Sequence, residues 1–178
     1  MPEVERQGSG WRGGLFLIIA ALVIALDQIS KLWVSSHLGL YQTVPVIGCL
    51  SLTHVRNTGS AFGLFANQAF LLTLVAIVGL VAILLFYRYL SRSNILGISA
   101  LGLVFGGAVG NLIDRLRFGY VTDFVDVRLW RDFHWPAFNV ADSAITVGSI
   151  MLAIFIFLTL RKGDGSSSGA RSKNTASH

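Results

Sequence analysis

The feature that most constrains this chain is a set of four long apolar runs spread over its 178 residues. Coiled as helices, these runs are close to the length needed to cross the hydrocarbon core of a bilayer. Hydrophobic residues make up 53% of the chain and charged residues only 13%, whereas soluble domains carry about 25% charged residues. The sequence therefore predicts one integral membrane domain, mainly α-helical, with four transmembrane helices. The expected spans are residues 15–34, 70–87, 95–113 and 143–160.

The segments outside this domain, which covers residues 15–160, are polar. Residues 1–14 form a leader, and the first apolar run after it is too long for a cleavable secretory signal. Residues 161–178 are rich in Gly, Ser, Lys and Arg, a composition that predicts a disordered tail. Cys49 is the only cysteine, so the chain has no internal disulfide.

The net charge of +5 is distributed in a way that indicates orientation. Eight basic and three acidic residues lie in the leader, the 88–94 turn and the tail, whereas six of each lie near the other face. The positive-inside rule then places both termini in the cytoplasm. The excess charge is a topology signal, so we expect no nucleic-acid partner.

Two regions do not read as spans. Residues 41–65 contain short runs with β-branched residues, which predict a small extracytoplasmic β element. Between the third and fourth spans we expect an interfacial loop or helix. Glycines at 102, 106 and 110 recur every four residues and predict a helix face for close packing, most economically against the protein's own helices.

Acidic residues gather beside the last two spans, where a carboxylate is costly and so suggests a working site. Five of the nine acidic residues fall within residues 111–143: Asp114, Asp123, Asp126, Asp132 and Asp142. Earlier in the chain, Asp27 and Lys31 share one face of the first helix at i and i+4.

Each of these polar residues also has a structural explanation. Asp27 and Lys31 could form an ion pair, Arg115 could anchor a headgroup or pair with Asp114, and Asp142 could cap its helix. These explanations account for the residues singly. They account less well for the convergence of four chain segments on one membrane face.

Hydrolysis by paired carboxylates is the chemistry that the residues favour. The sequence has no G-x-S-x-G or H-E-x-x-H motif and no cysteine near a histidine. Two adjacent aspartates share a proton, so one can activate water while the other protonates a carbonyl, without metal or cofactor. Asp123 and Asp142 are the best-placed pair, and Asp126 and Asp114 remain alternatives.

Other functions remain open from the residues alone. His54 and His134 are candidate ligands or bases, although a surface or interfacial histidine is more often inert. A small transporter or proton-conducting protein would also carry intramembrane charges. Against that alternative, the polar residues cluster at one face, and no repeat links the two halves. A structural subunit that binds a partner through the glycine face is a further alternative.

Five short blocks, taken together, strongly resemble bacterial lipoprotein signal peptidase, also called signal peptidase II. They are DQISK at 27–31, NTGSAFG at 57–63, GNLIDR at 110–115, VTDF at 121–124 and FNVADS at 138–143. The resemblance covers about residues 15–160. It implies an intramembrane aspartic endopeptidase of the bacterial cytoplasmic (inner) membrane. Its substrates would be diacylglyceryl-modified prolipoproteins, cut just before the lipidated cysteine.

The resemblance also implies roles for individual residues. The catalytic aspartates fall on Asp123 and Asp142. The supporting positions that it implies are Asp27, Asn57, Asn111, Asp114, Arg115, Asn139 and Ala141. We add Lys31, which shares a helix face with Asp27, and Gly59, which with Asn57 would fix the junction of the extracytoplasmic element. The resemblance further implies a monomer that contacts membrane lipid and is inhibited by globomycin. An aromatic cluster at Trp130, Phe133, Trp135 and Phe138 fits an interfacial belt that could close over the substrate.

Overall fold

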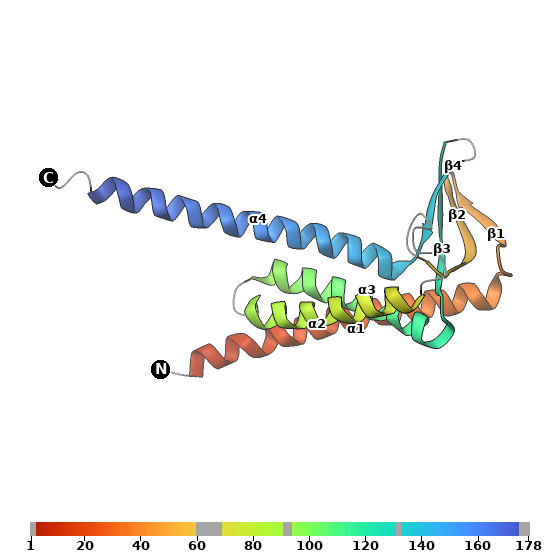
Figure 1. The fold of residues 1–178 in the computed structure, drawn as a ribbon, viewed down its shortest axis with the longest axis horizontal. Helices are drawn as coiled ribbons and strands as arrows, with labels where there is room; N and C mark the ends of the chain where they lie inside the picture. Colours follow the sequence, from red (N-terminus) through yellow and green to blue (C-terminus); the bar gives the residue numbers. More distant parts are fainter. Residues whose placement is uncertain (1–2, 60–68, 91–93, 131–132, 175–178) are drawn as a thin grey trace.

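The computed structural model describes residues 3–59, 69–90, 94–130 and 133–174. Its elements in chain order are α1 (Glu3–His37), β1 (Thr43–Ile47), β2 (Leu50–Asn57), α2 (Ala69–Leu90), α3 (Ile95–Phe118), β3 (Val121–Trp130), β4 (Phe133–Phe138) and α4 (Val140–Asn174). The helices run alongside one another, and the strands form one sheet across their ends (Figure 1). The start of α1 and the end of α4 lie at the opposite end (Figure 1).

Among the described residues, four helices are long and apolar enough to span a membrane, which confirms the predicted number. The apolar segments are Gly13–His37, Phe70–Arg88, Ile95–Phe118 and Val140–Arg161. The structure differs from the prediction at the tail, where α4 continues as a helix to Asn174. Once a helix has formed, each further residue adds one hydrogen bond without a new nucleation step, so even weak helix formers can extend it.

Glycines bring α3 into close contact with two neighbours. A Cβ atom at Gly106 would lie 2.8 Å from the backbone oxygen of Ala20 on α1. One at Gly107 would meet the backbone oxygen of Ala141 on α4. The predicted glycine face, which includes Gly106, therefore packs against α1, and Gly107 outside that face packs against α4, so α3 is the centre of the bundle.

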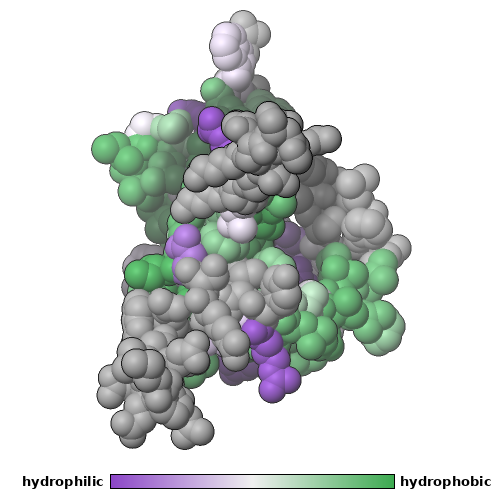
Figure 2. Space-filling model, turned by 90° about the vertical axis from the view of Figure 1, so that its left-hand side faces the viewer, coloured by the Kyte–Doolittle hydropathy of each residue, from purple (hydrophilic) through white to green (hydrophobic). Residues whose placement is uncertain are grey.

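α2 is peripheral and packs chiefly against α3. Of the described residues in its most apolar stretch, none is buried, whereas half of the corresponding stretch of α3 is. Figure 2, which views the bundle from the end away from the sheet, shows hydrophobic residues on both flanks. These flanks fit the acyl chains of a bilayer.

The sheet is antiparallel, with the strand order β1-β2-β3-β4. β1 and β2 confirm the predicted β element, although residues 60–65 lie outside the described residues. The prediction of an interfacial loop or helix between the third and fourth spans is wrong, because β3 and β4 form a hairpin there. β2 supplies the backbone partners of β3, and this register places Asp123 opposite Val55.

Two local features fix the sheet over the helix ends. Val34 and Leu38, at the end of α1, pack against Phe124 of β3. Gly119 has a φ of 77°, and its N–H donates to the backbone oxygen of Arg115 at 3.0 Å. This left-handed residue ends α3 and turns the chain directly into β3, which returns over the end of the helix.

Candidate active site

Polar side chains are buried where the helix ends meet the sheet. The buried polar residues are Asp27, Lys31, His54, Asn111, Asp114, Thr122, Asp123 and Asn139. Seven of them, all except His54, belong to one hydrogen-bonded and ion-paired group. His54 instead places Nδ1 2.9 Å from the backbone oxygen of Leu38, which is a structural contact. The predicted convergence of distant segments at one membrane face is therefore present in the fold.

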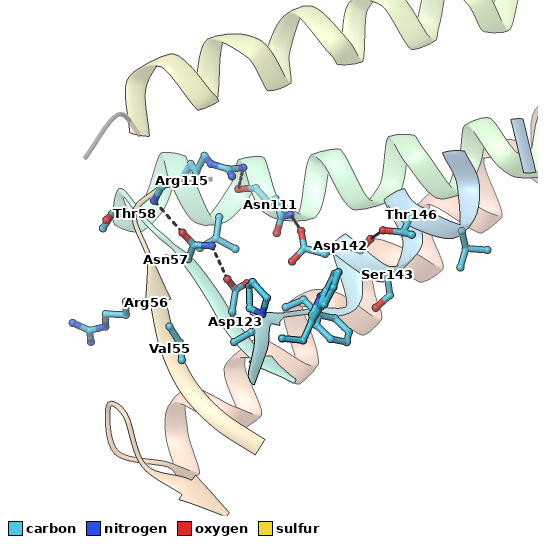
Figure 3. Close-up of a pocket in the computed structure, with 17 residues that line it drawn as sticks. Val55, Arg56, Asn57, Thr58, Asn111, Arg115, Asp123, Asp142, Ser143 and Thr146 are labelled. Atoms are coloured by element: carbon cyan, nitrogen blue, oxygen red, sulfur yellow. Dashed lines mark hydrogen bonds between the residues drawn. The ribbon is translucent and has the colours of Figure 1, made fainter. Parts of the chain in front are cut away.

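Asp123 and Asp142 line one pocket from two different elements. Asp123 comes from β3 and Asp142 from the first turn of α4 (Figure 3). The pocket has a volume of about 850 Å³ and is also lined by Asn57, Asn111 and Arg115. The structure thus brings together the two aspartates that the sequence favoured as a pair.

The sequence suggested Asp142 as the N-cap of its helix, but Asp142 is not the N-cap. The cap is Asn139, whose Oδ1 accepts from the backbone N–H of Asp142 at 2.9 Å. Asp142 Oδ2 accepts from the backbone N–H of Asn139 at 3.2 Å. This reciprocal pair is a capping box with an aspartate at its third helical position. The helix start therefore fixes the Asp142 carboxylate and favours its negative charge.

Three asparagine amides orient the two carboxylates. Each amide oxygen accepts a bond from a fixed donor: Lys31 Nζ for Asn111 (2.9 Å), the Asp142 N–H for Asn139 (2.9 Å), and the Gly59 N–H for Asn57 (3.0 Å). Each amide nitrogen must then face the other way. Asn111 donates to Asp142 Oδ1 at 2.8 Å, Asn139 to Asp123 Oδ1 at 2.7 Å, and Asn57 to Asp123 Oδ2 at 2.8 Å.

The amide orientations follow from the donors, since an amide oxygen cannot donate. Together with the capping bond, they give every oxygen of the two carboxylates a hydrogen-bond donor. Carboxylates held in this way cannot rotate freely, so their geometry is set before a substrate arrives.

A buried ion cluster lies beneath the pair. Lys31 Nζ is 2.8 Å from Asp27 Oδ2 and 3.2 Å from Asp114 Oδ2, and the three side chains are at most 5% exposed. The predicted pair of Asp27 and Lys31 is confirmed. The described ion-pair partner of Asp114 is Lys31 and not Arg115, because Lys31 crosses from α1 to α3.

Asp27 also holds the start of α4. Its Oδ1 accepts from the backbone N–H of Ala141 at 3.0 Å. Ala141 is fully buried, and a Cβ atom at Gly110 would lie 2.6 Å from Asp27 Oδ2. Small residues at both positions therefore leave room for this carboxylate next to the helix that carries Asp142.

Arg115 supplies a positive charge at the pocket. Its Nη1 donates to the backbone oxygen of Asn111 at 3.4 Å, and its guanidinium interacts electrostatically with Asp142, Asp123 and Asp114. Figure 3 shows its side chain running along α3 towards Asn111. A cation here can counter the charge of the pair or bind a substrate oxygen.

The environment of Asp123 favours its protonated form. Burial and, to a smaller extent, the negative charge of Asp142 raise the pKa of Asp123 to about 7, although the Asn57 and Asn139 amides and Lys31 act in the opposite direction. Asp142 keeps its two donors and its position at a helix N-terminus. The Asp123 carboxyl therefore keeps a proton up to about pH 7, well above the range of an ordinary aspartate.

Sequence reasoning missed two contributors to the site. Gln28 Nε2 donates to Asp114 Oδ1 at 3.0 Å and to Asp27 Oδ2 at 3.2 Å, linking the acidic members of the ion cluster. The backbone N–H of Thr122 donates to Asp114 Oδ2 at 3.0 Å. Gln28 lies inside an apolar run beside Asp27, and that placement was the available signal.

The remaining predicted residues lie elsewhere. Asp126 is not in a loop but on β3, where its Oδ1 is 2.6 Å from His134 Nδ1. Asp132 lies outside the described residues. Of the aromatic cluster, Trp135 and Phe138 line the pocket. Trp130 and Phe133 face each other in register towards the hairpin tip and are largely exposed.

Comparison with known proteins agrees with this arrangement. Residues 19–158 match the family model described as Signal peptidase (SPase) II. The lipoprotein signal peptidase of Syntrophotalea carbinolica is 47% identical over 144 residues, which cover 79% of this chain and 89% of that protein. The lipoprotein signal peptidase of Pseudomonas paraeruginosa is 42% identical over 170 residues, covering 92% and 98%.

A solved structure is similar over most of the fold. It is a bacterial membrane enzyme determined by the in meso method, with a TM-score of 0.75 and 32% sequence identity. The match covers 81% of this chain and 88% of that one. These relatives give no support to the transporter alternative. The helices make this a multi-pass membrane protein, and its pocket holds an aspartate pair. Because the residues that match the family model include both aspartates, the chain belongs to the signal peptidase II family of proteases.

Proposed function

We propose that this membrane protease removes the signal peptide from diacylglyceryl-modified prolipoproteins, with Asp123 and Asp142 as its catalytic pair. The observation that carries the proposal is that both carboxylates face one pocket, with a donor on each of their four oxygens. The relatives named lipoprotein signal peptidase support prolipoproteins as the substrates.

The proposed reaction begins with a single proton on the pair. The Asp142 carboxylate takes a proton from a water molecule, whose oxygen attacks the scissile carbonyl carbon. Asp123 gives its proton to the carbonyl oxygen, and a tetrahedral intermediate forms. When the carbon–nitrogen bond breaks, the leaving nitrogen takes the proton now on Asp142, and Asp123 takes one proton back from a hydroxyl of the intermediate, so the pair ends the cycle with a single proton. Because the two groups titrate as a unit, the proton changes place during each cycle.

The supporting residues act through this pair. Asn57, Asn111 and Asn139 hold the two carboxylates, and Arg115 binds a substrate oxygen or balances charge. Asp27, Lys31 and Asp114 hold the helix ends, Gly59 fixes the Asn57 amide, and Ala141 leaves space beside Asp142. None of them needs a metal or cofactor for the proposed role.

We also propose an orientation for the protein. The termini lie in the cytoplasm and the sheet at the extracytoplasmic face of the bacterial inner membrane, as the charge distribution favours. A pocket at that face lets water reach the pair while the substrate's acyl chains remain in the membrane lipid. We expect a monomer that globomycin inhibits.

The deciding experiment is cleavage of a diacylglyceryl-modified precursor peptide by the purified protein in detergent, with the cut located by mass spectrometry. Asp123→Asn and Asp142→Asn should each lower kcat by about 10²–10⁴-fold or more, because each removes one acid–base partner. Asp126→Asn is the matched control and should have a milder effect. Full activity in either dyad variant would defeat the proposed pair, and an inactive Asp126→Asn would move the role to that residue.

The pH profile tests the proton count. As the pH rises through about 7, Asp123 loses its proton and the pair becomes doubly ionised. We expect kcat/KM to fall about ten-fold per pH unit above that value, because only the singly protonated pair is active. A profile that stays flat to pH 9 would contradict the assignment of the shared proton.

A further inference from the structure

A row of polar side chains crosses the sheet, with one member on each strand. Thr43 Oγ1 on β1 is 2.9 Å from Thr53 Oγ1 on β2, and Thr53 donates to Asp126 Oδ2 on β3 at 3.0 Å. Asp126 Oδ1 is 2.6 Å from His134 Nδ1 on β4. Asp126 and His134 are not among the described residues that line the pocket. The row therefore connects strands without touching the proposed catalytic pair.

The link between Asp126 and His134 stands beside an interruption of the β3–β4 ladder. Val125 pairs with Phe138 and Val127 with Trp135, and the register shifts between them. Two residues of β4, Pro136 and Ala137, thus lie opposite Asp126 alone. Proline has no N–H to donate to the ladder, and a bulge of this kind turns side chains in a new direction.

The bulged part of β4 is also a wall of the pocket. Residues 135–138 all line it, together with Asp123 and Asp142. The backbone ladder is interrupted at this wall, so side-chain contacts can supply part of what holds β4 to β3. His134 immediately precedes the wall, and its bond to Asp126 is the shortest polar contact described between β3 and β4 side chains.

We propose that Asp126 and His134 are positioning residues that clamp β4 against β3 and thereby hold the pocket wall in its substrate-binding position. This inference rests on the proposed function for its effect on catalysis. The clamp acts on substrate binding, since neither residue reaches the reacting atoms. Its loss should therefore raise KM and leave kcat nearly unchanged.

One partner of the clamp is a histidine open to solvent. The His134 side chain is 46% exposed and that of Asp126 13%. The charged groups of the described residues that face His134 are Asp126 and its register partner Arg128, both on β3. β2 and β1 contribute the neutral Thr53 and Thr43.

A protonated imidazole forms an ion pair with Asp126, and a neutral one forms only a hydrogen bond. A lower pH favours the charged form of an imidazole, so the contact between these two side chains is stronger at the lower pH.

The first test compares the KM of the full-length protein and its variants for the diacylglyceryl-modified peptide at pH 6 and pH 8.5. His134→Ala should raise KM about two- to five-fold relative to the parent, with the larger ratio at pH 6. His134→Asn keeps a donor near the position of Nδ1 but cannot become charged. It should match the parent at pH 8.5 and fall behind it only at pH 6.

The matched control is His37→Asn on α1. The His37 ring contacts the backbone oxygen of Trp33 and the hydroxyl of Ser36. This variant should leave the pH dependence of KM unchanged. An unaltered KM in His134→Ala at both pH values, or an equal effect of His37→Asn, would overturn the clamp.

The second test does not depend on catalysis. Hydrogen exchange of the β3 and β4 amides in detergent should be faster in His134→Ala than in the parent, and more so at pH 6 after correction for the intrinsic rate. Exchange identical to the parent's would overturn the clamp even if the peptide is cleaved. If the parent fails to cleave the peptide, the proposed function fails, while the exchange measurement still decides whether the clamp exists.

Discussion

α2 and α3 are both apolar membrane helices, yet they occupy opposite positions in the molecule. α3 contacts both α1 and α4 through glycines and carries Asn111, Asp114 and Arg115 at its end. None of the described residues in the most apolar stretch of α2 is buried, and α2 packs chiefly against α3. The helix with fewer apolar side chains is therefore the centre of the fold.

The difference follows from the solvent. In water the most apolar segment is driven inside, but lipid chains are as apolar as leucine and provide no such drive. Close backbone approach and polar bonds then decide which helix is central. Variants of the central and peripheral helices test this comparison between α3 and α2.

Removing the cation between α1 and α3 should have the largest effect. Lys31→Met leaves Asp27 and Asp114 buried without their partner and should cost about 3–5 kcal/mol of unfolding free energy. Reversible unfolding in mixed micelles measures this loss. The control is Arg88→Met at the exposed end of α2, which should stay within about 0.5 kcal/mol of the parent. Equal losses in the two variants would remove the contrast between the helices.

Asn111→Leu tests the polar end of α3 with little change in volume. It removes the donor to Asp142 Oδ1 and should lower kcat by about 10- to 100-fold, as expected for a hydrogen bond to a charged group. The peptide-cleavage assay measures the change, and a folded variant with the parent's kcat would show that the amide does not orient Asp142.

Glycine substitutions compare the packed surface of each helix. Gly107→Ala brings a methyl group against the backbone of α4 and should cost about 1–3 kcal/mol through overpacking. No atom of the described residues lies within 4 Å of a Cβ added at Gly79 on α2, so Gly79→Ala should be neutral or stabilising by up to about 1 kcal/mol. The same unfolding measurement compares them, and a costly Gly79→Ala would place α2 in a closer contact than the structure shows.

The smallest effect is expected on the outer surface of α2. Leu85 is 63% exposed, so Leu85→Ala should change the unfolding free energy by less than about 0.5 kcal/mol. A loss of 2 kcal/mol or more, measured in micelles, would indicate that a further surface covers this helix.

Much of this arrangement could be predicted from the sequence because its signals are local. Apolar run length gives the four spans, and the i, i+4 spacing places Asp27 beside Lys31. The glycines at 102, 106 and 110 share a face because of helix periodicity alone. Such features depend on neighbours within a few residues.

The predictions that failed depended on partners that are distant in sequence. The alternation in residues 121–130 is a strand signal, but this region was predicted as an interfacial loop or helix, and its pairing with β2 cannot be read locally. Asn139 and Asp142 both suit a helix start, and only the backbone shows which one is the cap. Lys31, and not Arg115, pairs with Asp114 because two helices cross there.

The three fixed amides around the carboxylates have a consequence for how the protein can fail. An aspartate in place of Asn57, Asn111 or Asn139 would occupy almost the same space and cause no steric clash. It would, however, point an oxygen at an oxygen and add a negative charge next to the pair. The chemical loss of one amide nitrogen as the protein ages could therefore silence the enzyme while leaving its shape intact. At these three positions the site is specified by where hydrogen atoms lie more than by volume.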